Sequence, residues 1–500
     1  MLLPILSAVL LSSWTHPLQI WPLVWICLVP WLLSFSAKSS NREILAKGFS
    51  LSFSYGIITF YWVLLGVHNL FALSWISAFL LCLPMFFFHQ PQFLLFPFVL
   101  RYWLQRHPNP TPVKACLGLL GLAFLYTWLD SFFPKLFLDT LGDAFIGANH
   151  LRQAADIGGL HVLSFLAIFM NLGIWYAIRG KKQRSDFYPI LIALVLALSA
   201  SLYGFERKQS IDHLLAQSKT RINALVIQAN INYQNKSASQ LRDTNERDDL
   251  VKKYVSLSQL ALQTNSSADF IVWPETSYPG AFREGLGGNL KKREAKLETL
   301  SATSKIPLVF GSLDIEYPSK KLYNSIFLLE PSSRIQIYHK NFLLLFGERW
   351  PGAEWFPFLT ALIPSYKRLS PGAAPTLLQL PTKNGIVPIT PLICYEAIVE
   401  EYVAKAARLG GRLILNLSDD SWFGNSLEAE EHFDKAVFAS IETRLPQIRS
   451  TNSGISALIL PNGEIVEATK KMTEASVLYQ VPIMEPIPTI YMKWGDWLRK

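Results

Sequence analysis

Hydrophobic positions are unevenly distributed along the chain. Residues 1–204 consist mainly of long apolar runs, whereas residues 205–500 mix short apolar segments with polar ones. A helix needs about 20 apolar residues to cross the hydrocarbon core of a bilayer. By that measure the first part contains about seven candidate membrane spans, at residues 1–14, 18–36, 48–67, 71–100, 115–134, 158–178 and 187–204. Pro84 and the His-Gln-Pro stretch at 89–91 predict a kinked or broken helix in the fourth span.

The second part alternates between helical and extended patterns. Amphipathic segments predict helices at residues 247–263, 290–306, 397–411 and 430–446. Short apolar runs predict strands at residues 222–231, 268–275, 307–314, 412–418 and within 447–467, and hairpins at 323–340 and 385–396. This alternation predicts a layered α/β domain. We therefore expect a multi-pass helical membrane domain at 1–204, a linker at 205–219, the α/β domain at 220–483 and a C-terminal tail at 484–500.

Composition and charge are consistent with a membrane protein. Half of the residues are hydrophobic and the formal net charge is +9. Many basic residues lie in short loops between apolar runs, and the chain shows no basic-aromatic stripe, so no nucleic-acid partner is expected. The N-terminal run has no basic n-region and no small-residue cleavage site, which disfavours a cleaved signal peptide.

The loops predict the orientation in the membrane. Lys and Arg gather in the loops after the second, fourth and sixth spans, and are missing after the first and third. Positively charged loops remain in the cytoplasm. This alternation places the N-terminus in the cytoplasm and the α/β domain outside it, in the periplasm where the cell has one.

Cys394 is the candidate nucleophile. The chain has four cysteines, and the other three lie in strongly apolar runs, at positions 27, 82 and 116. Cysteines outside the cytoplasm usually pair, yet Cys394 has no other cysteine in its own domain. A lone thiol of this kind is either a small buried hydrophobe or a working nucleophile.

Two strand ends offer groups that could activate this thiol. Glu275 follows the apolar strand at 268–275, where desolvation would raise its pKa towards that of a usable base. Lys340 ends another strand and could stabilise a thiolate or an oxyanion. The competing interpretation is a plain helix or turn cap for Glu275 and a solvated charge for Lys340. His339 and His432 are the histidines available for a Cys–His pair, and neither has an obvious catalytic context.

Glu275, Lys340 and Cys394, in this order and each at a strand end, resemble the catalytic triad of the nitrilase superfamily. The strings WPE, YHKNFLLLFGE, ICYE and NLSDDSWFG carry the resemblance. It implies a four-layer α-β-β-α fold. It also implies that Glu275 is the general base, Lys340 the oxyanion stabiliser and Cys394 the nucleophile.

With membrane spans in front of such a domain, nearly the whole chain resembles the apolipoprotein N-acyltransferase family. The most specific strings are LSPG, PLICYEAI, NLSDDSWFG and RSTNSGISALILPNGEI. The resemblance implies acyl transfer from a membrane phospholipid, through a thioester on Cys394, to the α-amine of a diacylglyceryl-modified apolipoprotein. It implies a location in the bacterial inner membrane. No cofactor or metal is expected, since the sequence shows neither a phosphate-binding Gly-rich loop nor clustered His ligands. A monomer is expected.

Further site residues follow from the matched strings. Glu348 in FGERWP and Glu396 in CYE match family acids close to the triad, where they would orient Lys340 or the ester; a structural salt bridge is the alternative for each. Tyr395 is expected beside the nucleophile. Trp422 and Phe423 are expected to line the acyl pocket or to belong to the core. Asn416 and Asp420 are interpreted as structural.

Three features depart from the family pattern. The sequence stops at Lys500, soon after YMKWGDW, where family members usually continue into a last membrane helix. The stretch QANINYQNKSASQ lacks a Trp near residue 237, and FFPKLFLDTLGDAFIG lacks a GFPW-like string. These differences leave the triad intact, but they could alter the choice of donor, the choice of acceptor or the activity.

Two other functions remain open at this point. A membrane-tethered nitrilase-type amidase, or an acyltransferase with another acceptor, would keep the chemistry and change the substrate. A catalytically silent membrane scaffold or a transporter would use none of it. The spans carry few charged residues of the kind that transporters use, and the intact triad argues against a silent protein.

Overall fold

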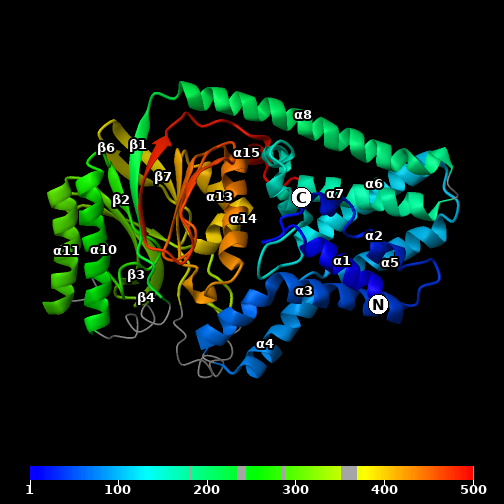
Figure 1. Cartoon of the computed structure of the whole chain (residues 1–500), viewed down its shortest axis with the longest axis horizontal. Helices are drawn as coiled ribbons and strands as arrows, with labels where there is room; N and C mark the ends of the chain where they lie inside the picture. Colours follow the sequence, from blue (N-terminus) through cyan, green and yellow to red (C-terminus); the bar gives the residue numbers. More distant parts are fainter. Residues whose placement is uncertain (72, 181–182, 233–243, 283–287, 351–368, 499–500) are drawn as a thin grey trace. The chain divides into compact units, whose positions relative to one another are not determined.

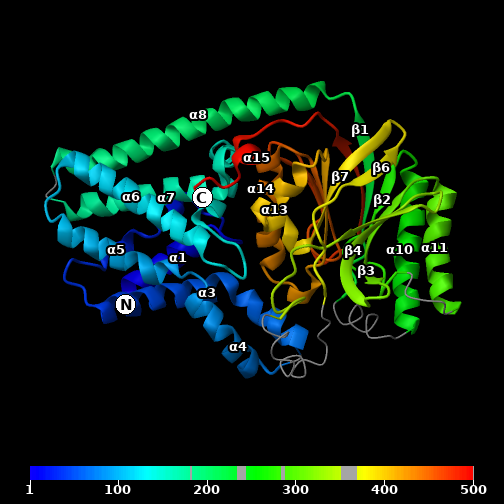
Figure 2. The same cartoon turned by 180° about the vertical axis from the view of Figure 1, so that it is seen from behind.

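The structure is a computed structural model that describes residues 1–71, 73–180, 183–232, 244–282, 288–350 and 369–498. The chain divides into two compact units (Figures 1 and 2). The first comprises Met1–His68, Ala72–Ser210 and Thr489–Lys500, and the second comprises Asn69–Phe71 and Ile211–Pro488. The stretch near residue 237, which lacks the Trp of the family pattern, lies outside the described residues.

The first unit is helical. Its elements are α1 (Leu2–Ser12), η1 (Trp21–Trp25), α2 (Val29–Leu33), α3 (Asn41–Phe71), α4 (Trp75–Phe88), α5 (Gln92–Arg106), α6 (Pro112–Phe132), η2 (Leu141–Gly147), η3 (Leu151–Ala154), α7 (Ala155–Arg179), η4 (Arg184–Phe187), most of α8 (Tyr188–Gln217) and α15 (Ile490–Trp494). Within the described ranges, five helical segments are long and apolar enough to cross a membrane, at Asn41–Phe71, Trp75–Arg106, Pro112–Phe132, Leu151–Arg179 and Arg184–Gln217. They correspond to the third to seventh predicted spans.

The predictions for the first two spans, the break in the fourth span and the linker are only partly confirmed. The first predicted span is an 11-residue helix, and the second is divided between η1 and α2. The fourth is broken between Phe88 and Gln92, as predicted. Helix α8 continues to Gln217, so most of the predicted linker at 205–219 is helical. The assignment of the two units as membrane and extracytoplasmic domains stays a prediction.

A cluster of buried polar side chains lies inside the first unit. The Asp139 carboxylate accepts hydrogen bonds from Gln90 Nε2 at 2.6 Å and from the Tyr55 hydroxyl at 2.9 Å, and lies 2.7 Å from His89 Nε2. Lys135 Nζ lies 2.6 Å from an Asp130 oxygen. Buried charges persist when they are paired in this way. The cluster fixes the broken α4–α5 segment to the chain that follows α6.

The second unit is an α/β domain built on two sheets. One sheet has the order β12-β1-β2-β3-β4-β5 and the other β11-β10-β9-β8-β7-β6. The strands of the first are β1 (Arg221–Gln228), β2 (Phe270–Val272), β3 (Leu308–Glu316), β4 (Lys321–Leu329), β5 (Ile335–His339) and β12 (Ala475–Pro482). Those of the second are β6 (Leu378–Thr382), β7 (Gly385–Ile393), β8 (Leu413–Ser418), β9 (Gln447–Thr451), β10 (Ala457–Ile459) and β11 (Ile465–Ala468).

Apolar residues between and outside the sheets hold the domain together. One buried cluster joins side chains of both sheets, such as Val272, Ile393 and Leu415. Another joins the first sheet to α10 (Thr244–Thr264) and α11 (Gly288–Ser304). Helices α13 (Glu400–Ala407) and α14 (Glu428–Thr443) lie along the second sheet (Figure 2). The predicted four-layer α-β-β-α class is confirmed.

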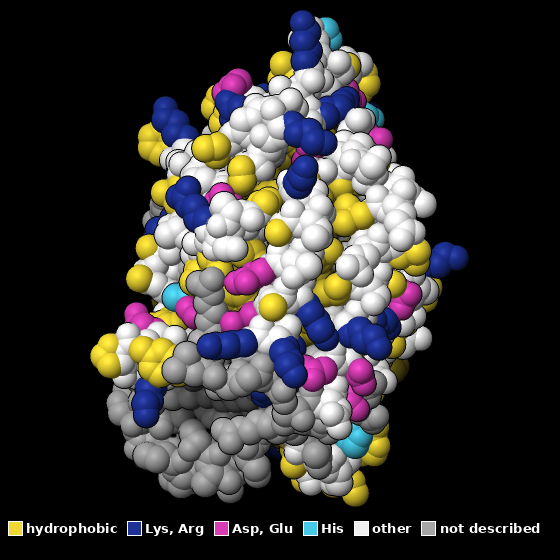
Figure 3. Space-filling view, turned by 90° about the vertical axis from the view of Figure 1, so that its left-hand side faces the viewer, with side chains coloured by type: hydrophobic (Ala, Val, Ile, Leu, Met, Phe, Trp, Pro, Cys, Tyr) yellow, Lys and Arg dark blue, Asp and Glu magenta, His cyan; other side chains and the backbone are white. Residues whose placement is uncertain are grey.

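One face of this domain, formed by α10 and α11, is rich in charged side chains (Figure 3). Figure 3, which views the side formed by α10 and α11, shows Lys and Arg interspersed with Asp and Glu and scattered hydrophobic side chains. Lys252, Lys291 and Lys296 are exposed, whereas Tyr254 and Leu297 face inward. This is the usual amphipathic division of a surface helix.

Two details of the strands differ from the sequence prediction. Residues 385–396 do not form a hairpin-like pair: Gly385–Ile393 is the single strand β7, and its antiparallel partner is β6. Strand β12, which pairs with β1 along its whole length, was not predicted. The first error concerns where a local hairpin turns, since β6 and β7 turn at residues 383–384 and not within 385–396. The second concerns long-range pairing, which local patterns do not encode.

The strand directions bring Glu275 and Lys340 to one edge of the first sheet. Strands β1, β2 and β3 are parallel, and the two antiparallel steps through β4 return β5 to the direction of β3. The carboxyl ends of β2 and β5, which precede Glu275 and Lys340, therefore lie at the same edge. Strand β7 ends directly before Cys394 in the facing sheet.

Candidate active site

Glu275 is held by the close packing of its backbone on β3. The segment after β2 lies so near Gly311 that a Cβ there would be 2.6 Å from Glu275 Cα. Gly311 N also donates to the Pro274 carbonyl at 3.1 Å. Because only glycine leaves this room, the backbone of Glu275 is held at the strand end. The Glu275 side chain is buried.

Lys340 is fixed at the end of β5 and pairs with two carboxylates. Its backbone N–H donates to the Asn324 carbonyl at 2.8 Å. Its Nζ lies 2.8 Å from Glu348 Oε2 and 3.7 Å from Glu275 Oε1. The side chain is only 1% exposed, so this ammonium depends on the two carboxylates for its charge balance.

Asn324 connects the two carboxylates, and sequence reasoning missed it. Its Nδ2 donates to Glu275 Oε1 at 2.7 Å and to Glu348 Oε1 at 2.9 Å. Glu348 Oε2 also accepts from the backbone N–H of Leu344 at 2.8 Å. The available signal was a lone amide inside the apolar run YNSIFLL.

The charges of this cluster shift its acid–base equilibria. Burial raises the pKa of Glu275, the Lys340 ammonium opposes this, and the nearby Glu348 carboxylate adds to it. Burial acts to lower the pKa of Lys340, but the carboxylates of Glu348 and Glu275 outweigh burial and raise it. Lys340 therefore stays charged, while Glu275 binds a proton more readily than an exposed carboxylate.

Cys394 begins η5 (Cys394–Ile398), directly after β7. Its φ of 50° lies in the left-handed region, and its side chain is partly exposed. Burial raises the pKa of the Cys394 thiol and the Glu275 charge adds to this, whereas Lys340 and a hydrogen bond with Ser418 lower it. The thiol is therefore neutral at rest and needs a base to react.

Glu396 organises the backbone around the nucleophile. Its carboxylate accepts from the N–H groups of Ile393 at 2.8 Å and Asn341 at 2.6 Å, and from the Tyr338 hydroxyl at 2.8 Å. Burial raises the pKa of Glu396 to about 7, against the opposing effects of the Lys340 charge and these hydrogen bonds. Glu396 thus ties the strand end before Cys394 to the loop after Lys340.

Replacement of Glu396 by glutamine is expected to destabilise the protein by about 2 kcal/mol, because the amide nitrogen cannot accept and one buried N–H loses its partner. The free energy of unfolding of the purified protein measures this. Tyr338→Phe is the matched control, since it removes one donor and leaves the backbone contacts, so its effect should be smaller. An equal effect of both substitutions would contradict this role of Glu396.

The other predicted site residues lie around this cluster. Burial raises the pKa of Tyr395 to about 12, although the Lys340 charge opposes it. Trp422 and Phe423 form η6 (Ser421–Phe423) and are partly exposed. A Cβ on Gly347 would lie 3.3 Å from the Trp422 ring, so this ring packs on the loop that carries Glu348. Their predicted role in an acyl pocket remains a prediction.

A second polar cluster lies behind Cys394. Asn416 Nδ2 is 3.5 Å from the Cys394 carbonyl oxygen, and its Oδ1 accepts from Arg449 Nη1 at 2.7 Å. Asp420, Glu428 and His432 each direct a potential metal-ligand atom to one place. The Arg449 guanidinium, 3.2 Å from Asp420, already supplies a positive charge there. The structural role predicted for Asn416 and Asp420 fits these contacts.

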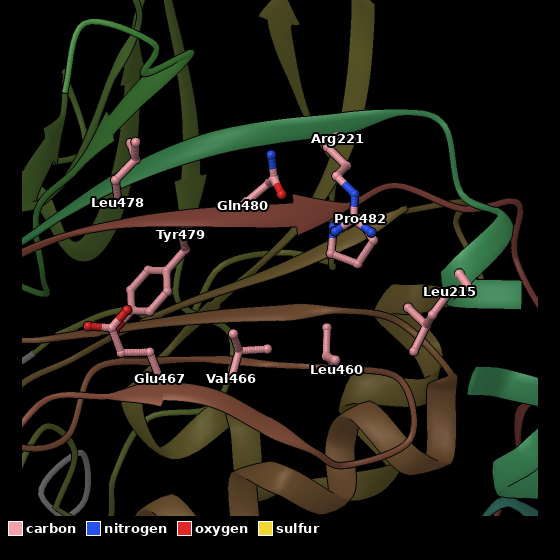
Figure 4. Close-up of a pocket in the computed structure, with 10 residues that line it drawn as sticks. Leu215, Arg221, Leu460, Val466, Glu467, Leu478, Tyr479, Gln480 and Pro482 are labelled. Carbon is pink, nitrogen blue, oxygen red and sulfur yellow. The ribbon is translucent and has the colours of Figure 1, made fainter. Parts of the chain in front are cut away.

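A separate cavity lies elsewhere in this unit. It has a volume of about 390 Å³ and is open along β1, β12 and the β10–β11 hairpin (Figure 4). Arg221, Glu467 and Tyr479 are among its lining residues. None of the candidate catalytic side chains lines it, so it is not the site described above.

The arrangement supports nucleophilic attack on a carbonyl group. Cys394 supplies a nucleophile, Glu275 a buried carboxylate that can take its proton, and Lys340 a fixed cation that acts on both. Each charge is positioned by neighbours before a substrate binds. Such preorganisation suits the stabilisation of a tetrahedral oxyanion.

Comparison with known proteins identifies the family. The carbon-nitrogen hydrolase family matches residues 226–484, and the apolipoprotein N-acyltransferase N-terminal domain matches residues 7–173. The apolipoprotein N-acyltransferase of Geobacter metallireducens is 30% identical over 513 residues, covering 99% of this chain and 91% of that relative. The chain belongs to the apolipoprotein N-acyltransferase family. The enzyme of the same name from Bdellovibrio bacteriovorus is 28% identical over 507 residues, covering 99% and 90%.

Solved structures similar to this member of the apolipoprotein N-acyltransferase family come from the nitrilase superfamily. Saccharomyces cerevisiae Nit3 is 16% identical, with 56% of this chain and 95% of that chain covered and a TM-score of 0.39. The carbon-nitrogen hydrolase from Helicobacter pylori G27 is 13% identical, with 56% and 92% covered and a TM-score of 0.37. Family membership and the five apolar helices together make the protein an integral bacterial membrane protein.

Proposed function

We propose that the protein is an N-acyltransferase that moves an acyl chain from a membrane phospholipid to the α-amine of the diacylglyceryl-cysteine of an apolipoprotein. Its near full-length similarity to enzymes of this name supports the reaction. The single observation that carries the mechanism is the buried Lys340 ammonium between Glu275 and Glu348, beside the Cys394 thiol.

The first half-reaction loads the enzyme. Glu275 takes the thiol proton as Cys394 Sγ attacks the ester carbonyl carbon of the phospholipid. Lys340 stabilises the oxyanion of the tetrahedral intermediate. When the C–O bond breaks, the lysophospholipid oxygen takes a proton from Glu275 and leaves, and the acyl chain remains on Cys394 as a thioester.

The second half-reaction repeats this chemistry with an amine. The α-amine of the apolipoprotein cysteine attacks the thioester carbonyl carbon, and Glu275 takes a proton from the nitrogen. The C–S bond then breaks and Cys394 leaves as a thiolate, which regains a proton. An amide forms, and the same base and cation serve both steps.

The proposed substrates determine the expected location. A phospholipid donor and a lipid-modified acceptor both reside in a bilayer, and the five apolar helices would anchor the chain in that bilayer. We propose the bacterial inner membrane, with the N-terminus in the cytoplasm and the α/β domain in the periplasm, from the positively charged loops. Glu275, Lys340 and Cys394 come from one chain, so a monomer would be sufficient.

The test of this proposal is acyl labelling of the protein. Purified protein is incubated with phospholipid carrying a labelled acyl chain and quenched in acid. We expect label that neutral hydroxylamine removes in the wild type, and none in Cys394→Ala, where the nucleophile is missing. Cys116→Ala, which changes a cysteine of the helical unit, is the matched control and should be labelled normally. Label that persists in Cys394→Ala would refute the thioester, and no label in the wild type would refute the donor.

A further inference from the structure

His432, on α14, has an acceptor facing each of its ring nitrogens. Its Nδ1 lies 3.1 Å from Asp420 Oδ1 and 3.4 Å from Glu428 Oε1. Its Nε2 lies 3.4 Å from the backbone carbonyl oxygen of Cys394. A neutral imidazole carries a proton on one nitrogen only, so satisfying both sides requires the imidazolium form.

The charges around His432 favour that form. Burial and the Arg449 charge act to lower the pKa of His432, but its bonds to Asp420 and Glu428 outweigh them and raise it. Asp420 also accepts from Arg449 Nη2 at 3.2 Å and from Ser418 Oγ at 3.0 Å. The imidazolium thus belongs to a buried network in which cations and carboxylates alternate.

The Cys394 backbone needs such support. A non-glycine residue in the left-handed region costs about 1 to 2 kcal/mol, and it persists only where surrounding contacts hold it. The Cys394 carbonyl faces two donors, His432 Nε2 and Asn416 Nδ2 at 3.5 Å. Arg449 fixes the other end of Asn416 and also contacts Asp420, so both donors are held by one guanidinium.

We propose that His432 is a positioning residue for the nucleophile: its imidazolium, held by Asp420 and Glu428, donates from Nε2 to the Cys394 carbonyl and fixes the backbone that aims the thiol at Glu275 and Lys340. The inference rests on the proposed acyltransfer reaction of Cys394. His432 acts through the backbone and takes no proton from the substrate. It differs in this from the His of a Cys–His pair, which would face the sulfur.

Two substitutions separate the two sides of the ring. The amide nitrogen of glutamine reaches about as far as Nε2, whereas that of asparagine reaches only as far as Nδ1. His432→Gln can therefore keep the donor to the Cys394 carbonyl, and His432→Asn cannot. We expect the rate of Cys394 acylation by labelled phospholipid to fall about tenfold in His432→Asn and clearly less in His432→Gln, with little change in KM. His213→Asn, an exposed histidine on α8, is the matched control and should behave as wild type.

A second measurement works without any lipid substrate. The rate of Cys394 alkylation by iodoacetamide is read on the Cys394 peptide by mass spectrometry, so that Cys27, Cys82 and Cys116 do not contribute. In His432→Asn we expect the Cys394 thiol to move away from Lys340. It should therefore be alkylated several-fold more slowly in His432→Asn than in His432→Gln. If the wild type is not acylated, the proposed function fails, whereas the alkylation rates still test the positioning role.

Two results would overturn the inference. Folded His432→Asn protein with wild-type acylation and alkylation rates would show that the carbonyl contact is dispensable. Equal losses in both variants, together with an equal fall in their unfolding temperatures, would show that His432 only stabilises the fold. The proposal requires that the glutamine variant recovers rate relative to the asparagine variant.

Discussion

Replacement of Glu275 by glutamine is expected to lower the rate of Cys394 acylation by about 10³-fold. The glutamine oxygen can still accept the hydrogen bond that Asn324 Nδ2 donates to Glu275 at 2.7 Å. The geometry of the site should therefore survive, and what is lost is the group that takes the thiol proton. Because burial raises the pKa of the Cys394 thiol, the uncatalysed thiolate fraction at neutral pH is small.

The pH profile distinguishes a base from a structural carboxylate. Only the ionised form of Glu275 can take a proton, and burial raises its pKa above the usual range. The wild-type single-turnover acylation rate should therefore rise as the pH increases through this raised pKa. Glu275→Gln should lack that rise and recover rate only at the high pH where the thiol ionises. Glu298→Gln, on the outer helix α11, is the control. A variant with the wild-type profile would exclude Glu275 as the base.

Much of the site could be predicted because its chemistry coincides with strong local patterns. Glu275, Lys340 and Cys394 each stand at the end of a run of residues that forms a strand. The ends of such strands are positioned by the sheet. Their order along the chain then matched a known triad. What the sequence could not provide is the distance between them, which arises from two sheets that face each other.

Asn324 and His432 show where this kind of reasoning stops. Asn324 lies inside β4, and only the strand register shows that its amide faces Glu275 and Glu348. His432 was weighed as a partner of the Cys394 sulfur, whereas its ring faces the Cys394 carbonyl oxygen. Both roles depend on long-range packing. The same is true of β12, whose partner β1 is distant in the sequence.

Replacement of Lys340 by methionine is expected to abolish acylation and to lower the free energy of unfolding by about 3 to 5 kcal/mol. Methionine keeps an unbranched apolar chain but removes the ammonium that lies between Glu275 and Glu348. The two carboxylates would then remain buried without a cation, and the oxyanion would lose its stabilising charge. Denaturant unfolding and acyl labelling measure the two losses separately.

The pH dependence and a second substitution separate these losses further. Without Lys340, its charge would no longer oppose the effect of burial on the pKa of Glu275, so this carboxylate would bind a proton more tightly in the folded than in the unfolded protein. The stability deficit of Lys340→Met should therefore be smallest in acid and grow as the pH rises through the raised pKa of Glu275. Adding Glu348→Gln removes one of the unpaired charges, so Lys340→Met/Glu348→Gln should recover stability at neutral pH while acylation stays absent. Recovery of acylation in this double variant would mean that Lys340 serves only to balance Glu348, and that another group stabilises the oxyanion.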